Sequence, residues 1–262
     1  MKIHVLGCHG SDGLLQSDRG STSCHTCGFL VNDTFLIDAG TIANRLPLSA
    51  LTQIRHIVLS HLHFDHIKGL PTFADNLSYL ASQPVIVAGI PEITKGLREY
   101  IFNTQVYPDF FHIPSLENPV LKSFSLCPGN THSLSEFEVT PIAVNHTVPT
   151  TGFIVQDRGS AFLYSGDTYS TDELWQVARR NSLLTTALIE CSYPDSMADL
   201  ARLSKHLTPA LLARELVKLD RPDIAIYAYH LKPAYKDEIV SQLMALQIPN
   251  LRVLEEGQTL TI

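Results

Sequence analysis

Four side chains of types that commonly bind metal ions fall within six positions, directly after the apolar run at residues 57–59. They are His61, His63, Asp65 and His66. If the strand continues, the side chains at 61, 63 and 65 share one side, because strand side chains alternate, and His66 points elsewhere. One turn could then serve two metal ions about 3.5–4 Å apart, the usual separation in two-metal hydrolytic sites. Imidazole and carboxylate ligands suit zinc, manganese or iron.

Four donors do not complete two coordination spheres, so further ligands are expected at the ends of other strands. His146 ends the run "AVNH", and His230 ends the run "IYAYH". Asp167 lies in "LYSGDT", where Gly166 allows a close approach of the backbone. Six other histidines we interpret as ordinary core or surface residues: His4, His9, His25, His56, His112 and His132.

The composition is that of a globular protein, and 262 residues fit a single domain spanning residues 1–262. The net charge of −7 argues against electrostatic binding of nucleic acid over a broad surface, because such binding requires clustered Lys and Arg. It leaves room for a small anionic substrate, because a bound divalent metal ion dominates the local field.

The five cysteines form an odd, sparse set, which favours reduced thiols and a cytoplasmic location. The segment "MKIHVLGCHG" lacks the apolar core of a signal peptide, and no run approaches the roughly 18 apolar residues of a membrane span. Cys24 and Cys27 form one Cys-x-x-Cys pair, but a structural zinc site needs a second pair. We therefore expect these thiols to be structural or incidental.

Apolar runs predict strands in both halves of the chain, at residues 2–7, 56–60, 84–89, 137–146, 151–157, 160–167, 185–191 and 223–230. Residues 28–40 contain two further apolar runs joined at Asn32-Asp33, which predicts a hairpin. Helical patterns follow at residues 71–84, 91–102, 171–180, 208–219 and 236–246. Residues 8–26 read as a loop. Two strand-rich halves that each close with helices predict an α/β protein, an αββα four-layer sandwich.

Residues 103–135 are irregular, aromatic and rich in proline, which indicates an insertion or cap over the site. Its aromatic side chains, with Tyr100 just before it, leave two interpretations open. Tyr100, Tyr107, Phe110 and Phe111 could line a pocket and stack on a base, or they could pack the insertion against the core.

The pattern of His61, His63, Asp65 and His66, followed by His146, Asp167 and His230, resembles the metallo-β-lactamase superfamily, whose fold is the αββα sandwich. The resemblance implies a ligand distribution. It assigns the first metal to His61, His63 and His146, the second to Asp65, His66 and His230, and makes Asp167 the bridge.

Several segments resemble the class II cyclic-nucleotide phosphodiesterases in particular: "HLHFDHIKGL", "IFNTQVYPDFFHIP", "VNHTVPTTGF", "YSGDT", "ECSYPD", "HLTPALLARELVKL" and "YHLKPAYKDEI". Phe64 departs from that class, which often has Leu there, and its glycine-rich N-terminal turn is altered here to "GCHGSDG". The altered turn puts nearby substrate contacts in doubt.

Glu190 in "ECS" and His206 in "HLT" also resemble motifs of the tRNA-processing endonuclease RNase Z, and in both groups they imply a phosphodiester substrate. His206 could protonate the leaving oxygen while Glu190 orients it. The alternative is that both residues cap local structure. An RNase Z needs a basic arm, whereas residues 103–135 contain Lys122 as their single basic residue.

The resemblance therefore implies a dinuclear-metal phosphodiesterase that hydrolyses 3′,5′-cyclic AMP or cyclic GMP to the nucleoside 5′-monophosphate. Two divalent ions, with zinc expected and manganese or iron as alternatives, would lower the pKa of a shared water toward about 7, giving a bridging hydroxide that Asp65 orients. The expected partner is a small cyclic nucleotide, rather than a membrane or a nucleic acid, in a homodimer. An RNase Z-like enzyme, a phosphodiesterase for another cyclic phosphate and a catalytically silent metal-binding domain are the alternatives.

Overall fold

The computed structural model describes residues 1–17, 20–80 and 83–262, and within these residues two seven-stranded sheets carry the fold. In spatial order, the first sheet consists of β16 (Thr259–Thr261), β1 (Lys2–Gly7), β4 (Gly28–Val31), β5 (Phe35–Ile37), β6 (His56–Val58), β7 (Val85–Gly89) and β8 (Leu121–Ser125). The second consists of β15 (Leu251–Val253), β14 (Ala225–Tyr229), β13 (Leu184–Glu190), β12 (Ala161–Tyr164), β11 (Thr151–Gln156), β10 (Phe137–Ala143) and β9 (His132–Leu134).

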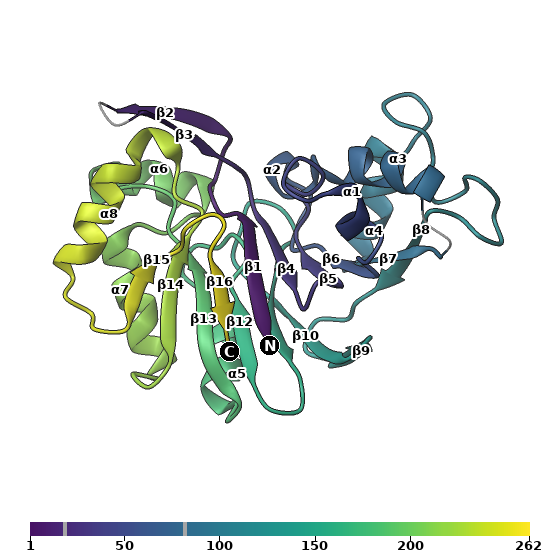
Figure 1. Ribbon diagram of the computed structural model, residues 1–262. Helices are drawn as coiled ribbons and strands as arrows, with labels where there is room; N and C mark the ends of the chain where they lie inside the picture. The colour runs from purple at the N-terminus through teal and green to yellow at the C-terminus, as the bar shows by residue number, and fades with distance from the viewer. Residues whose placement is uncertain (18–19, 81–82) are drawn as a thin grey trace.

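Helices cover the outer face of each sheet, which gives four layers (Figure 1). Beside the first sheet lie α1 (Leu48–Leu51), α2 (Phe64–Ile67), α3 (Leu70–Leu80), α4 (Pro91–Gly96) and the π-helix η1 (Leu97–Ile101). Beside the second lie α5 (Glu173–Arg180), η2 (Asp195–Met197), α6 (Ala198–Ser204), α7 (Pro209–Leu219), η3 (Pro233–Tyr235) and α8 (Lys236–Ala245). The predicted αββα sandwich is confirmed. None of these described helices is long and apolar enough to cross a bilayer.

Strand alternation explains the layers. Phe29 and Phe35 point between the sheets, whereas Leu30 and Leu36, one position along, join the core under the first-sheet helices. On the second sheet, Phe153 and Tyr164 enter the same central layer. The sheets therefore meet through aromatic contacts, such as that between the rings of Phe29 and Tyr164, whose centroids are 5.4 Å apart.

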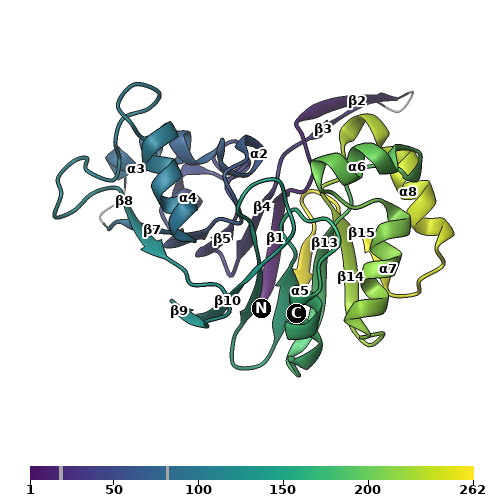
Figure 2. The ribbon, with the colours of Figure 1, turned by 180° about the vertical axis from the view of Figure 1, so that it is seen from behind.

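The direction of the parallel strands determines at which edge of the sandwich the candidate functional side chains lie. β5, β6 and β7 are parallel in the first sheet, as are β12, β13 and β14 in the second. The loops that follow their carboxyl ends therefore meet at one edge of the sandwich. Both chain termini lie at the opposite edge, where the Met1 amino group donates a hydrogen bond to the carbonyl of Ile262 at 2.8 Å (Figures 1 and 2).

Two polar segments differ from the sequence prediction. Residues 8–26, predicted as a loop, contain the hairpin β2 (Gly13–Ser17) and β3 (Gly20–Cys24), which projects from the carboxyl edge (Figure 2). Residues 103–135 contain β8 and β9, the edge strands of the two sheets. Their exposed polar residues give no apolar periodicity, so the sequence carries little sign of them. The covering role of the insertion stays a prediction.

Candidate metal centre

The structure brings all seven predicted ligand side chains together at the carboxyl edge. His61 and His63 follow β6, and Asp65 and His66 lie in α2. His146, Asp167 and His230 follow β10, β12 and β14.

The sequence-based premise that the strand continues through residue 65 was wrong. The chain does not continue as a strand, because helix α2 begins at Phe64 with His63 as its N-cap, at φ −62° and ψ 144°. Helical residues turn by about 100° per position, so strand alternation stops before Asp65. His66 therefore faces the site beside His61, with ring centroids 4.2 Å apart.

The first donor group comprises His61, His63, His146 and Asp167, whose donor atoms all lie within 4.8 Å of one another. His63 Nδ1 lies 3.1 Å from His146 Nε2, and His61 Nε2 lies 3.6 Å from Asp167 Oδ2. Three of these residues are buried and His63 is half-buried, so the group is reached from one side.

The second donor group surrounds His230. Its Nε2 atom lies 3.3 Å from His66 Nε2, 3.3 Å from Asp65 Oδ2 and 3.3 Å from Asp167 Oδ2. The Oδ2 atom of Asp167 therefore lies near donors of both groups. Cys27 is also close, with Sγ within 4.8 Å of donor nitrogens of His66 and His230, which the sequence did not indicate.

The donor chemistry fits divalent cations. Among the described residues, His61 Nε2 and Asp167 Oδ1 are buried atoms without a hydrogen-bond partner, which is rare in folded proteins. Two pairs of imidazole nitrogens also face each other, at 3.1 Å between His63 and His146 and at 3.3 Å between His66 and His230. A cation bound between such nitrogens would satisfy both of them.

In four of the donor histidines, the Nδ1 nitrogen has a hydrogen-bond partner that fixes the ring. Nδ1 of His66 donates to Asp38 at 2.7 Å, and Nδ1 of His146 donates to the carbonyl of Lys205 at 3.1 Å. Nδ1 of His230 donates to Ser192 Oγ at 2.8 Å, and Nδ1 of His61 lies 3.0 Å from Ser60 Oγ. These bonds direct Nε2 of each ring toward the other donors, as the surrounding partners of metal-binding histidines do.

The electrostatic surroundings keep most of the donors in the protonation state that binds a cation. Burial lowers the pKa of His61 well below its usual range and lowers the pKa of His146 to about 4. Burial opposes ionisation of Asp167, but His230 and His66 outweigh it and hold the pKa of Asp167 well below its usual range. Neutral imidazole and ionised carboxylate are the forms that bind metal.

His66 differs from its neighbours. Burial lowers its pKa, yet the carboxylates of Asp167 and Asp38 outweigh burial and raise the pKa of His66 well above its usual value. Negative charge is therefore concentrated around this ring, and a bound cation would neutralise it.

Asp38 is a residue of the site that the sequence analysis missed. It is fully buried directly after β5, at φ +54°. Its carboxylate accepts hydrogen bonds from His66 Nδ1, from the amide and hydroxyl of Ser60, both at 2.8 Å, and from the Tyr164 hydroxyl at 2.5 Å. The available signal was its position at the end of a buried strand, in "FLIDAG".

Glu190 and His206 meet beside the donors. Glu190 ends β13 and is fully buried, and its Oε1 accepts hydrogen bonds from His206 Nδ1 at 2.8 Å and from the Thr168 amide at 2.9 Å. The His206 ring stacks on His230, with centroids 5.3 Å apart. Burial disfavours the charged ring, but the Glu190 carboxylate outweighs it and raises the pKa of His206.

The sequence left open whether the aromatic side chains in and beside the insertion line a pocket or pack against the core. Phe110 and Phe111 are buried in the core beneath the first-sheet helices, and Tyr107 packs against that core. Packing therefore accounts for these three rings. Tyr100 is 60% exposed.

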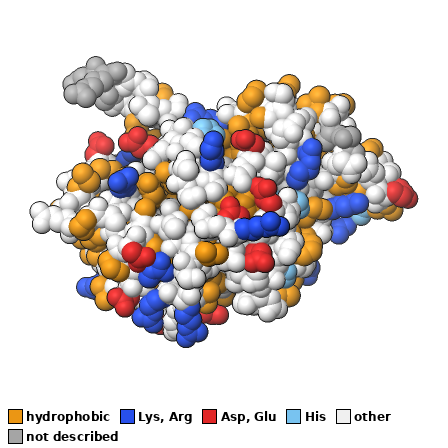
Figure 3. Space-filling view, turned by 60° about the horizontal axis from the view of Figure 1, so that its bottom comes forward, with side chains coloured by type: hydrophobic (Ala, Val, Ile, Leu, Met, Phe, Trp, Pro, Cys, Tyr) orange, Lys and Arg blue, Asp and Glu red, His pale blue; other side chains and the backbone are white. Residues whose placement is uncertain are grey.

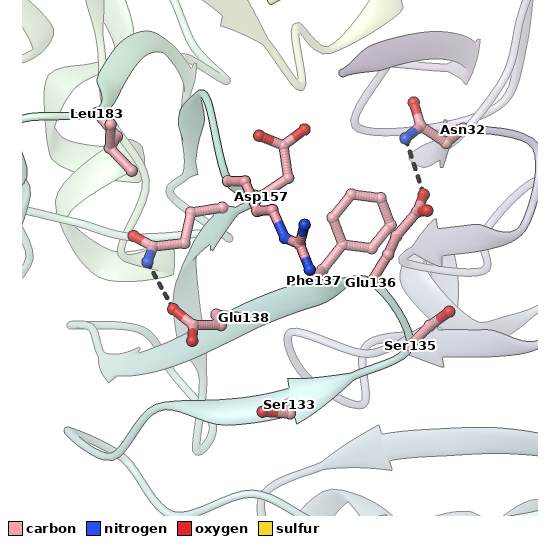
Figure 4. Close-up of a pocket in the computed structure, with 10 residues that line it drawn as sticks. Asn32, Ser133, Ser135, Glu136, Phe137, Glu138, Asp157 and Leu183 are labelled. Atoms are coloured by element: carbon pink, nitrogen blue, oxygen red, sulfur yellow. Dashed lines mark hydrogen bonds between the residues drawn. The ribbon is translucent and has the colours of Figure 1, made fainter.

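A hollow of about 790 Å³ lies at the other edge of the sheets, away from the metal donors (Figure 4). Its lining includes Asn32, which donates to Glu136 at 2.9 Å, and Gln156, which donates to Glu138 at 2.7 Å. Glu136 and Glu138 are engaged by these amides, and the hollow contains none of the histidines of the site.

A family model described as a β-lactamase superfamily domain matches residues 33–227, which is most of the chain. The matched range contains six of the seven donors, with His230 just beyond it. The chain therefore belongs to the metallo-β-lactamase superfamily, which confirms the resemblance.

Curated proteins similar to this chain include a protein named as a probable cyclic-nucleotide phosphodiesterase and several named as ribonuclease Z. A probable 3′,5′-cyclic-nucleotide phosphodiesterase of Yersinia pestis is 26% identical over 70% of this chain and 59% of its own length. A ribonuclease Z of Macrococcus caseolyticus is 28% identical over 58% of this chain and 48% of its own length. The match thus spans between about half and three-fifths of these two relatives.

Two solved structures share the fold over the whole chain. Unliganded yeast PDE1 superposes with a TM-score of 0.80 at 20% identity, covering 100% of this chain and 99% of its own. The short form of human tRNase Z gives 0.69 at 19% identity, covering 100% and 99%.

Proposed function

We propose that the protein is a dinuclear-metal phosphodiesterase that hydrolyses 3′,5′-cyclic nucleotides to nucleoside 5′-monophosphates. The observation that carries the proposal is the position of the Glu190–His206 pair directly beside seven converging metal-type donors. The Yersinia pestis relative, named as a probable cyclic-nucleotide phosphodiesterase, supports the same substrate class.

In this proposal, His61, His63 and His146 hold one ion, Asp65, His66 and His230 hold the other, and Asp167 serves both. Asp167 Oδ2, at 3.3–3.6 Å from nitrogens of His61, His66 and His230, supports the shared role. When bound, divalent ions, proposed as zinc, would lower the pKa of water and neutralise charge on the phosphoryl oxygens.

Side chains of this protein orient the attacking water and supply a proton to the leaving 3′-oxygen. Asp65 accepts a hydrogen bond from the attacking water and aligns it with phosphorus, opposite the 3′-oxygen, and the proton that this water loses passes to solvent. As the new P–O bond forms, the bond from phosphorus to the 3′-oxygen breaks, and His206 donates the proton on Nε2 to that oxygen. Because Glu190 accepts the Nδ1 hydrogen at 2.8 Å, it favours the protonated ring and fixes its direction.

An RNase Z-like activity is the second candidate, because curated relatives of this chain include several ribonucleases Z. A tRNA substrate needs a basic surface, and the chain has a net charge of −7. On the face drawn in Figure 3, Lys and Arg side chains are interspersed with Asp and Glu. A small substrate agrees better with this charge. A phosphodiesterase for another cyclic phosphate would use the same site residues.

A substrate panel tests the proposal. Protein loaded with zinc, manganese or iron is assayed with cyclic AMP, cyclic GMP, a base-free cyclic sugar phosphate and precursor tRNA. We expect turnover of a cyclic nucleotide, and loss of both metal and activity in Asp167→Ala and His63→Ala. Cleavage of precursor tRNA with both cyclic nucleotides left intact would contradict the proposal and favour the second candidate.

A further inference from the structure

A row of ring side chains leads from the donor site toward the surface. The His206 ring stacks on His230 at a centroid distance of 5.3 Å. Tyr193 lies 5.8 Å from His206, and Tyr235 lies 6.4 Å from Tyr193. Both tyrosines are half-buried, so part of each ring remains accessible.

The row ends in a groove of about 530 Å³ between β2 of the hairpin and the short helix η3. Its lining includes Leu14, Leu15, Tyr193, Leu200, Lys232 and Tyr235. Leu14 and Leu200 are 59% and 41% exposed, so the groove presents apolar surface to solvent beside a polar site.

The groove is physically joined to the donor site. Gly10 packs against His230 so closely that a Cβ atom on Gly10 would lie 2.9 Å from the His230 ring. Lys232, two residues after His230, donates a hydrogen bond from Nζ to the carbonyl of Gly10. On the other side, Lys68 in the turn after α2 forms an ion pair with Asp12 at the start of the hairpin. The segments that line the groove are therefore held against the segments that carry the donors.

We infer that this groove binds the planar base of a nucleotide whose phosphate lies at the metal centre, with Tyr193 as the main stacking surface. The inference rests on the proposed function and adds the element that recognises the substrate. Stacking of a base on an aromatic ring contributes about 1–3 kcal/mol and tolerates different bases. Apolar walls with few polar groups are typical of small-molecule sites.

The structure favours this groove over the aromatic insertion. Phe110 and Phe111 are 3% and 6% exposed and are occupied by core packing. Tyr193, in contrast, contacts a ring of the site directly, and its hairpin-side neighbours belong to the polar segment that the sequence marked as altered.

Binding of two probes tests the inference without relying on turnover. The affinities of metal-loaded protein for 5′-AMP and for ribose 5-phosphate, which lacks the base, are measured by calorimetry. We expect wild type to bind 5′-AMP at least about fivefold more tightly, which corresponds to about 1 kcal/mol, the low end of one stacking contact. Tyr193→Ala should abolish the preference, whereas Tyr193→Phe, which keeps the ring, should retain it.

Control variants separate the groove from general effects. Tyr79→Ala removes a tyrosine that is 86% exposed on α3, on the other half of the sandwich, and should leave the preference unchanged. Tyr235→Ala should reduce the preference, and it replaces Tyr193→Ala if thermal melting shows that variant to be unfolded. Equal affinity of wild type for the two probes, or an undiminished preference in folded Tyr193→Ala, would overturn the inference.

Cyclic AMP turnover by the same preparations distinguishes the two proposals. Turnover without a base preference would overturn the groove and leave the proposed function standing. A base preference that depends on Tyr193, without turnover of any cyclic nucleotide, would overturn the proposed reaction and keep the groove as a nucleotide site.

Discussion

At the scale of single residues, Asp38 links the donor site to the protein around it. Its carboxylate accepts four hydrogen bonds and fixes the Nδ1 side of His66. An Asn at this position would keep the size but lose the charge and one acceptor. Four donors would then compete for fewer lone pairs in a fully buried place.

We predict that Asp38→Asn lowers metal affinity or activity by about 10–100-fold, the usual cost of losing a partner that orients a metal ligand. Asp33→Asn is the matched control, because Asp33 is an exposed residue with a similar left-handed backbone, at φ +62° against +54° for Asp38. Metal content and kcat/KM measure the effect. Equal behaviour of the two variants would show that Asp38 does not orient His66.

The role proposed for His206 makes a different prediction, about the leaving group. We expect His206→Ala to slow cyclic AMP hydrolysis by about 10²–10⁴-fold, the usual contribution of a general acid. A p-nitrophenyl phosphodiester should be affected far less, because p-nitrophenolate leaves without a proton. Glu190→Gln should show the same pattern in weaker form. Equal losses on both substrates would argue for a structural role instead.

At the scale of elements, short helix α2 depends on a close backbone approach at Gly40. A Cβ atom on Gly40 would collide with the carbonyl of Asp65. The same segment is anchored by the amide of Ala39, which donates to the carbonyl of His66 at 2.7 Å. The loop after β5 and the ligand turn after β6 are therefore built as one unit.

Gly40→Ala should displace α2, lower metal affinity and destabilise the fold. The added Cβ atom would meet the backbone carbonyl of Asp65, which cannot move aside as a flexible side chain can. Gly159→Ala provides the control, since a Cβ atom there would meet Asp157 at an ordinary 3.8 Å. Metal titration and thermal melting of both variants provide the comparison. Unchanged metal affinity in Gly40→Ala would show that α2 tolerates the shift.

The same elements explain what the sequence could predict. Strands β6, β12 and β14 are largely buried and read as continuous apolar runs, so their ends, and the donors after them, could be located. The helix that starts at Phe64 could not, because it lies within a polar turn. Asp38 could not be distinguished either, since its role comes from partners up to 126 residues away.

At the scale of the whole molecule, Glu256 joins distant parts of the chain near the site. Its carboxylate contacts Nδ1 of His9 at 2.8 Å and Nδ1 of His25 at 2.7 Å, and accepts the His25 amide at 2.5 Å. The segment between β15 and β16 is thereby fastened to the loops that follow β1 and precede β4. No local pattern could reveal this contact, which spans more than 230 positions.

Glu256→Gln should lower the free energy of unfolding at pH 7 by about 1.5–3 kcal/mol, the range for hydrogen bonds to a charged group. Burial alone would raise the pKa of Glu256, but hydrogen bonds from His9 and His25 outweigh it and lower that pKa. The stabilisation is therefore present above the unfolded-state pKa, near about 4.3, and is lost as pH falls through the lower folded-state value.

Denaturant unfolding at several pH values measures this dependence. The difference between wild type and Glu256→Gln should shrink as pH falls from about 4.3 through the lower folded-state pKa, because Glu256 then becomes protonated and is uncharged like Gln. Glu255→Gln, at the exposed neighbouring position, should change stability little at any pH. A difference that stays constant down to acid pH would assign the effect to packing.

The native ion, the homodimer and the cytoplasmic location stay predictions, whereas the central claim can be measured directly. The number of metal ions per chain is determined by elemental analysis after dialysis against zinc, manganese or iron, for wild type and for Asp167→Ala. The account predicts two ions per wild-type chain and a clear loss in Asp167→Ala. One ion or none in wild type with all three metals would contradict it.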